Sequence, residues 1–262
     1  ALEEGVRADA PDAVHKSRVA TRRLRSLLKT FRPLFDRDRT DALRVELRWL
    51  GEALGAPRDA EVLKEEFGDL LSQLGPDAVP PDARDRLLGH LDEQHAQGHA
   101  ALVEALDGPR MDALRAALVA LLVEPPLEGA ADRPADEVLP KLRRRAIDEV
   151  ASLRKWARHE PGELERWHEV RKAAKAVRYA TEALVGAMPE LEDDAELWEA
   201  VTEAFGVVQD TVVAGDLIDA AAGAGGVKDG GVWGLLREAQ NERRRAAFRA
   251  GRKALRVALD RR

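Results

Sequence analysis

The stretch 15–32, HKSRVATRRLRSLLKTFR, decides how this sequence is interpreted. At about 100° per residue, the periodicity of an α-helix, six of its basic side chains recur at steps of three and four and share one stripe. They are His15, Arg18, Arg22, Arg25, Lys29 and Arg32. Leu24, Leu28 and Phe31 fall on the roughly opposite side, which we expect to face a core. No Asp or Glu occurs between Ala13 and Phe35, although the formal net charge of the chain is −6. The stripe therefore predicts a polyanionic ligand.

The alternative interpretation of such a stripe is a solvated helix face. A solvated face usually mixes signs, because Glu–Lys pairs one turn apart stabilise a helix, whereas like charges at that spacing destabilise it by a few tenths of a kcal/mol. This stripe carries charges of one sign only. Packing does not require that arrangement, and a bound anion would explain it.

Composition limits the classes of protein and site. The chain has 262 residues, 34% of them charged and 4% aromatic. It has no cysteine, which excludes disulfides, thiolate metal sites and a cysteine nucleophile. Ala, Leu, Glu and Arg dominate without β-branched runs, and this composition predicts an all-α fold. No signal-peptide pattern and no apolar run long enough to span a membrane occurs, so we expect a cytoplasmic protein with no membrane partner and no cofactor.

The pattern predicts a series of helices separated by Pro and Gly. The expected helices cover 13–35, 40–54, 57–73, 82–106, 110–123, 137–158, 163–187, 192–220 (with a break near Gly206) and 232–259. Residues 1–10 resemble the end of a helix whose beginning lies outside the sequence. Residues 124–136 are rich in proline and lack periodicity, so we place a linker at 126–133 between two halves, 1–125 and 134–262.

The basic motif is repeated in the second half. Residues 168–178 read HEVRKAAKAVR and align with 15–25 at an offset of 153. The alignment pairs His15 with His168, Arg18 with Arg171, Arg22 with Lys175 and Arg25 with Arg178. A second landmark, 54–59 (LGAPRD), aligns with 205–210 (FGVVQD) at an offset of 151. Two landmarks in the same order indicate a duplicated unit, which predicts two helical bundles related by a pseudo-twofold axis with their cationic helices facing one another.

The motifs HKSRVATRRLRSLL, LRWLGEALGAPRDAEVL and HEVRKAAKAVRYATEAL resemble those of the CHAD family, the conserved-histidine α-helical domain. The resemblance extends over essentially the whole chain and implies one CHAD domain over 1–262, made of two four-helix bundles around a basic pore. It also implies non-catalytic binding of inorganic polyphosphate and a role in targeting or scaffolding at polyphosphate granules, where partner proteins are unidentified. The implied binding residues are His15, Arg18, Arg22, Arg25, His168, Arg171, Lys175 and Arg178, to which the stripe adds Lys29.

Further basic residues extend this prediction on other helices. Arg245, Arg249 and Arg252 follow one another at steps of four and three on the last helix, and Lys141 and Arg144 lie in another basic segment. Glu169 and Glu182 place negative charge beside the second motif, so we expect the second half to bind more weakly.

Phosphate chemistry accounts for the residue types. Polyphosphate offers no bases or rings, so its recognition rests on charge-assisted hydrogen bonds, for which the arginine fork is well suited. Such binding should weaken steeply with salt. A bound polyanion would also raise the pKa of His15 and His168, so we expect tighter binding below neutral pH.

Three alternatives are weighed against this function. An enzyme acting on phosphoanhydrides of polyphosphate or nucleotides would need metal-binding carboxylates, which the stripes lack, so we predict no catalytic residues. A metal-chelating module would use paired histidines, either His15 with His168 or His95 with His99, near His90; we predict no metal site. A single-stranded nucleic-acid binder would need aromatic platforms beside the stripes, and we expect the tryptophans in the core or at a bundle seam instead: Trp49, Trp156, Trp167, Trp198 and Trp233.

Overall fold

The chain folds into helices, as its composition predicts. The computed structural model describes residues 2–74, 81–225 and 230–261, and contains no strand within them beyond an isolated bridge between Phe35 and Leu127. The α-helices are α1 (Leu2–Arg7), α2 (Ala13–Thr30), α3 (Arg37–Ala53), α4 (Gly55–Leu74), α5 (Pro81–Asp107), α6 (Pro109–Val123), α7 (Ala135–His159), α8 (Leu164–Val185), α9 (Glu192–Gly225) and α10 (Gly230–Asp260). Short 3₁₀ turns are η1 (Arg32–Leu34), η2 (Gly129–Asp132) and η3 (Pro189–Leu191). The all-α prediction is confirmed, but the break predicted near Gly206 is wrong, because α9 continues through it.

The chain forms two compact units. Unit 1 comprises 1–22, 43–124 and 212–241, and unit 2 comprises 23–42, 125–211 and 242–262. Each unit therefore draws on both halves of the sequence. The division into 1–125, the 126–133 linker and 134–262 stays a prediction about the repeat.

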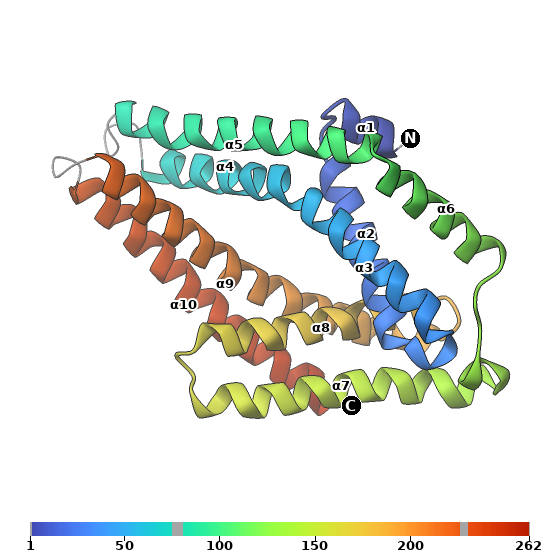
Figure 1. The fold of residues 1–262 in the computed structure, drawn as a ribbon. Helices are drawn as coiled ribbons and strands as arrows, with labels where there is room; N and C mark the ends of the chain where they lie inside the picture. The colour runs from blue at the N-terminus through green and yellow to red at the C-terminus, as the bar shows by residue number, and fades with distance from the viewer. Residues whose placement is uncertain (1, 75–80, 226–229, 262) are drawn as a thin grey trace. The chain divides into compact units, whose positions relative to one another are not determined.

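Apolar side chains of α4, α5, α9 and α10 form a core of unit 1. Its buried members are Leu63, Phe67, Leu71, Leu91, Ala214, Ile218, Trp233 and Leu236. Figure 1 shows α4 and α5 lying side by side. The backbones approach closely at Gly98 of α5, where an added Cβ would lie 2.8 Å from the backbone nitrogen of Pro57. Glycine is required at this position because a side chain would collide with the backbone of α4.

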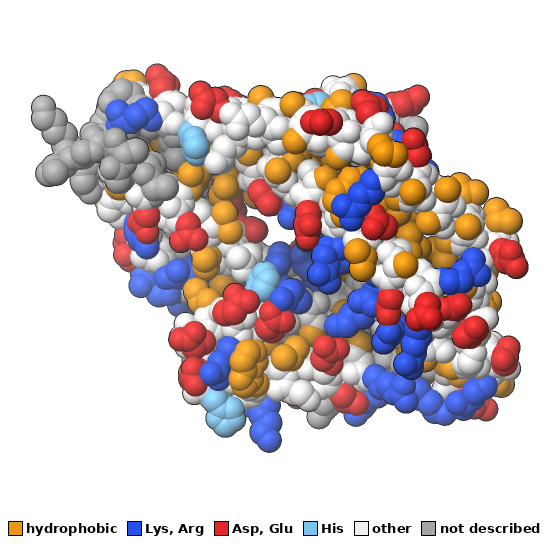
Figure 2. Space-filling view, viewed as in Figure 1, with side chains coloured by type: hydrophobic (Ala, Val, Ile, Leu, Met, Phe, Trp, Pro, Cys, Tyr) orange, Lys and Arg blue, Asp and Glu red, His pale blue; other side chains and the backbone are white. Residues whose placement is uncertain are grey.

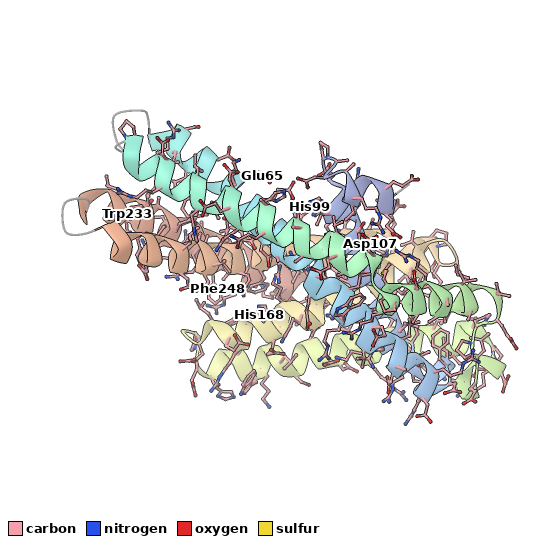
Figure 3. All side chains as sticks on the ribbon, turned by 45° about the horizontal axis from the view of Figure 1, so that its top comes forward. Glu65, His99, Asp107, His168, Trp233 and Phe248 are labelled. Carbon is pink, nitrogen blue, oxygen red and sulfur yellow. The ribbon has the colours of Figure 1, made fainter. Side chains whose placement is uncertain are left out.

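Two histidines of α5 attach the first residues of unit 1. His99, labelled in Figure 3, donates from Nε2 to the carbonyl of Val6 at 2.7 Å. His95 faces an acceptor from each ring nitrogen: the Pro57 carbonyl at 3.2 Å and the Asp9 carboxylate at 2.9 Å. The hydrogen bond to Asp9 raises the pKa of His95, with burial acting against it. A ring with two acceptors is best satisfied when both nitrogens carry a proton.

The larger core of unit 2 lies among α7, α8, α9 and α10. Trp167 stacks on Phe205, with ring centroids 5.6 Å apart, and meets the edge of Phe248 at 5.0 Å. Gly251 of α10 allows this packing, because an added Cβ would lie 3.2 Å from the Phe205 ring. This aromatic group holds α8, α9 and α10 in a fixed arrangement.

A second core of unit 2 joins the end of α2 to α7 and α8. Its buried members are Phe31, Val138, Leu142, Ala180 and Leu184. The segment 126–133 is attached to the same region: the Asp36 amide donates to the Pro126 carbonyl at 2.8 Å, and the Glu128 amide donates to the Leu34 carbonyl at 2.9 Å. The predicted linker is thus fixed by backbone hydrogen bonds.

Apolar side chains remain exposed on α6. Leu122 is 83% exposed, and Val119 and Val123 are exposed as well. Figure 2 shows the apolar side chains that gather over this helix. None of the helices in the described part of the chain is both long and apolar enough to cross a lipid bilayer.

The tryptophans follow the prediction only in part. Trp167, Trp198 and Trp233 are buried. Trp156 is 44% exposed and lies under the guanidinium of Arg166, with Cζ 4.8 Å from the ring centroid. Trp156 therefore lies outside the core, and stacking beneath a cation satisfies its partly solvated indole.

Candidate functional site

Helix α2 contributes its basic stripe to both units. Ala13, Val14 and Leu28 are buried on its apolar side, which fixes the orientation of the helix. The first three members of the stripe, His15, Arg18 and Arg22, belong to unit 1, and the next two, Arg25 and Lys29, belong to unit 2.

The unit 1 part of the stripe contains two different kinds of arginine. Arg18 pairs with Asp59, with Nη1 and Oδ1 2.5 Å apart. Arg22 differs, because its Nε is buried and has no hydrogen-bond partner among the described residues. The same holds for the Nε of Arg58, whose side chain is 14% exposed and whose Nη1 pairs with Glu61 at 2.7 Å. Unsatisfied buried donors of this kind are costly and favour an acceptor supplied from outside.

His15 lies beside these cations. Burial lowers its pKa from the ordinary value of 6.5, and the charges of Arg58 and Arg22 lower it further. Asp12 and Glu61 act in the opposite direction without reversing the shift. The surroundings of His15 therefore carry an excess of positive charge, which an anion would neutralise.

The two landmarks of the repeat come together in each unit. In unit 1, a Cβ added at Gly55 would lie 3.9 Å from Nη2 of Arg18. In unit 2, a Cβ added at Gly206 would lie 3.8 Å from Nη2 of Arg171. In each unit, therefore, the glycine of the second landmark lies beside the guanidinium of the first arginine of the motif.

Side chains of the α8 motif form hydrogen bonds and ion pairs within unit 2. Nδ1 of His168 donates to the Gln209 amide oxygen at 2.6 Å. Arg178 is held by Glu182, with Nε and Oε1 2.6 Å apart, and by Glu199. Burial acts to lower the pKa of Arg178, but the bonds and charges of these carboxylates outweigh it and the pKa is raised. Arg178 therefore has internal anions already. Lys175 and Arg171 lie on the same helix and, like Arg178, are partly exposed.

Glu182 also links the two basic helices inside unit 2. Nη2 of Arg23 lies 3.2 Å from Oε2 of Glu182. The end of α2 and the end of α8 therefore lie close together in this unit, with Arg25 and Lys29 on the α2 side.

Lys29 lines a pocket of about 280 Å³ in unit 2. The other basic residues of this pocket are Arg32, Arg37 and Arg145, and Glu149 is its acidic member. Lys29 and Glu149 are 3.7 Å apart and both half exposed. Sequence reasoning assigned no role to Arg37, because its position becomes visible only after the chain turns at η1.

The candidates on α7 and α10 fall into two groups. Arg249 and Arg252 line another basic pocket of unit 2, of about 450 Å³. Arg245 is exposed elsewhere on α10, and Lys141 and Arg144 are exposed on α7, where Arg144 pairs with Asp148 at 3.3 Å. None of these last three lines the pocket.

The histidines proposed as metal ligands have other partners. His95 and His99 are hydrogen-bonded to Asp9 and Val6 as described above. Within 2–74, 81–225 and 230–261, no group of three or more His, Cys, Asp or Glu side chains is placed to hold a metal ion.

Comparison with known proteins gives consistent results. A family model described as the CHAD domain matches residues 1–219. Two uncharacterized proteins of Mycobacterium tuberculosis, Rv2226 from strain H37Rv and MT2285 from strain CDC 1551, are each 33% identical over 270 residues, covering 98% of this chain and 52% of their own length. The chain thus spans about half the length of these curated relatives. The CHAD domain of the plant Ricinus communis is 26% identical with a TM-score of 0.72, covering 97% of this chain and 85% of that one. PptA from Streptomyces chartreusis, 22% identical, shares the fold with a TM-score of 0.79, covering 94% of this chain and 89% of its own.

Proposed function

Because the chain belongs to the CHAD domain family, we propose that it binds inorganic polyphosphate without catalysis, through the basic residues of α2 and α8. The binding residues are His15, Arg18, Arg22, Arg25, Lys29, His168, Arg171, Lys175 and Arg178, and binding would target the protein to polyphosphate granules in the cytoplasm. The names of the mycobacterial relatives assign no ligand, so the proposal rests on the residues of this chain.

One observation carries the proposal: the positive charge around His15 is incompletely balanced. The buried Nε of Arg22 has no partner in the described structure, and burial together with the neighbouring arginines depresses the pKa of His15. A chain of phosphates would supply acceptors for Arg22 and negative charge for His15 at once.

The members of the site should contribute unequally. Arg22 has a buried donor to satisfy, whereas Arg18 shares its charge with Asp59 and Arg178 shares its charge with Glu182 and Glu199. Charge-assisted hydrogen bonds contribute about 1.5–3 kcal/mol each, so loss of an arginine with an unsatisfied donor should weaken binding by about tenfold or more. Loss of a partnered arginine should cost less.

The test is a titration of the protein with long-chain polyphosphate at low salt. We expect R22Q to bind about tenfold more weakly. K16Q is the matched control, since Lys16 is exposed on the same helix outside the stripe, and its affinity should stay within about twofold. D59N should bind severalfold more tightly, because it frees Arg18 from its carboxylate. Circular dichroism checks that each variant keeps its helices.

Two outcomes would overturn the proposal. Equal losses of affinity in R22Q and K16Q would mean that polyphosphate binding depends only on the overall charge of the protein. Equally tight binding of single-stranded DNA with matched charge would mean that the site does not select phosphate chains. Orthophosphate released from polyphosphate in the presence of Mg²⁺ would instead support the phosphoanhydride enzyme.

A further inference from the structure

A basic pocket outside the two motifs lies within unit 2, among α7, α8 and α10. Its volume is about 450 Å³. Six of its lining side chains are cationic: Arg154, Arg158, Arg249, Arg252, Lys253 and Arg256. Two helices supply these charges, with α7 giving two and α10 giving four.

The charges of this pocket are not balanced by its own lining. None of the lining residues is acidic, and no ion pair in the described part of the chain involves Arg154, Arg158 or Arg256. Arg110, another exposed arginine, differs, because it pairs with Glu46 at 2.6 Å. Burial lowers the pKa of Arg154, and the charges of Arg158, Arg252 and Arg256 lower it further, against the opposing effect of Asp260.

Trp167 gives independent evidence of a missing acceptor. It lines the pocket, it is 2% exposed, and its Nε1 is buried with no hydrogen-bond partner among the described residues. The guanidinium of Arg252 lies 5.7 Å from the Trp167 ring and 5.8 Å from the ring of Phe248, which is labelled in Figure 3. These aromatic rings hold one pocket cation in position before any ligand arrives.

We propose that this pocket binds a small anion carrying several phosphate groups, held by the arginines of α7 and α10 and by the indole N–H of Trp167. Several phosphates are needed because one phosphate would leave most of the six charges unopposed. A compact ligand fits better than an extended polymer, because the cations surround a single cavity. The pocket contains no residue of the His15 or His168 motif, so this inference goes beyond the proposed function.

Two sources share this chemistry, and calorimetry on the full chain distinguishes them. Tripolyphosphate tests for a free linear oligophosphate, and inositol hexakisphosphate tests for phosphates arranged on a ring. We expect saturable one-to-one binding of one of them at low salt. R158Q should weaken it about tenfold and R158Q/R256Q about a hundredfold, because each loses a charge-assisted contact. Arg158 and Arg256 are both exposed, so the fold should tolerate both changes.

The matched control is K155Q. Lys155 is exposed on the same turn of α7 but does not line the pocket, so its loss should change affinity less than about twofold. A second readout is the ¹⁵N–¹H resonance of the Trp167 indole, assigned with W167F, which should move when Nε1 gains an acceptor. R22Q should bind the small ligand like the wild type, which separates this pocket from the polyphosphate site.

The following results would overturn the proposal. No binding of either probe, or equal losses for R158Q and K155Q, overturns the proposal. A ligand that binds but leaves the Trp167 indole resonance in place, or whose affinity falls in R22Q and not in R158Q, binds at the α2 surface and also overturns it.

Discussion

At the scale of single residues, the same cationic side chain serves different purposes along the two motifs. Arg178 is held by two internal carboxylates, Arg18 by one, and the Nε of Arg22 has no partner in the described chain. A sequence pattern gives these positions equal weight. The contacts divide them into structural cations and cations that are available to a ligand.

His15 should make polyphosphate binding depend on pH. In the free protein its pKa lies below the ordinary 6.5, because of burial and the charges of Arg58 and Arg22. A bound polyanion raises this pKa, so the complex takes up a proton as it forms and affinity should rise as pH falls. We expect a gain of severalfold between about pH 8 and about pH 5.5 in the wild type and a smaller gain in H15Q, measured by titration at constant ionic strength.

The stability of the folded protein should decrease as pH falls, whereas its affinity for polyphosphate should increase. The unfolded chain binds a proton at His15 at its ordinary pKa, above that of the folded chain, so the free energy of unfolding decreases as pH falls below 6.5. H15Q should therefore lose less stability than the wild type on acidification, measured by urea unfolding. If the affinity for polyphosphate changed equally with pH in the wild type and in H15Q, the assignment of His15 to the binding site would be contradicted.

Features of the site that depend on one helix could be predicted from the sequence, whereas those that depend on contacts between helices could not. The sequence predicted that Arg18 and Arg22 share one helical stripe, because that prediction needs only helical periodicity. It did not identify Asp59 as the partner of Arg18, or the pocket of Arg154, Arg158 and Arg256, because these depend on which helices pack together. The spacing of Arg154 and Arg158, one helical turn apart, was the available signal.

At the scale of elements, helix contacts depend on a few glycines. Gly98 lies where α5 crosses the start of α4, and a Cβ there would lie 2.8 Å from the Pro57 nitrogen and 3.0 Å from the Ala56 carbonyl carbon. Gly89 lies on the same helix, and a Cβ added there would meet no atom within 4 Å. The two glycines therefore have different physical reasons for being present.

Alanine substitution should separate these two glycines. G89A should stabilise the protein by about 0.5–1 kcal/mol, because alanine loses less backbone entropy in a helix. G98A should destabilise it by about 1–3 kcal/mol, because backbone atoms must move to admit the methyl group. Thermal unfolding followed by circular dichroism measures both, and equal shifts for the two variants would rule out the close contact.

Helix positions were largely predictable, because Pro and Gly punctuate long periodic segments. The exceptions have physical causes. Gly206 does not end α9, which continues through it with the Arg171 guanidinium beside this glycine. The segment predicted as a linker, 126–133, is held by backbone hydrogen bonds to Leu34 and Asp36, which no local pattern reveals.

At the scale of the whole molecule, local charge and net charge have opposite signs. The chain is acidic overall, at −6, while the pocket of about 450 Å³ in unit 2 is lined mainly by Arg and Lys. An acidic surface elsewhere discourages non-specific adhesion to polyanions, so affinity for phosphate should come from defined surfaces. The repeat was visible in the sequence, but the assignment of segments to the two units was not, because long-range contacts decide it.

The composition of the two units has a consequence for cutting the chain. The core of unit 1 joins Leu63, Phe67 and Leu91 from the first half to Ile218 and Trp233 from the second. A break within 126–133 would therefore leave fragment 1–125 without half of its apolar contacts, while fragment 134–262 would keep the core around Trp167. Expressed alone, the first fragment should show little cooperative unfolding, and mixing it with the second should restore native near-ultraviolet circular dichroism. On this prediction the dependence runs in one direction: the first half of the chain needs apolar side chains from the second to complete its core.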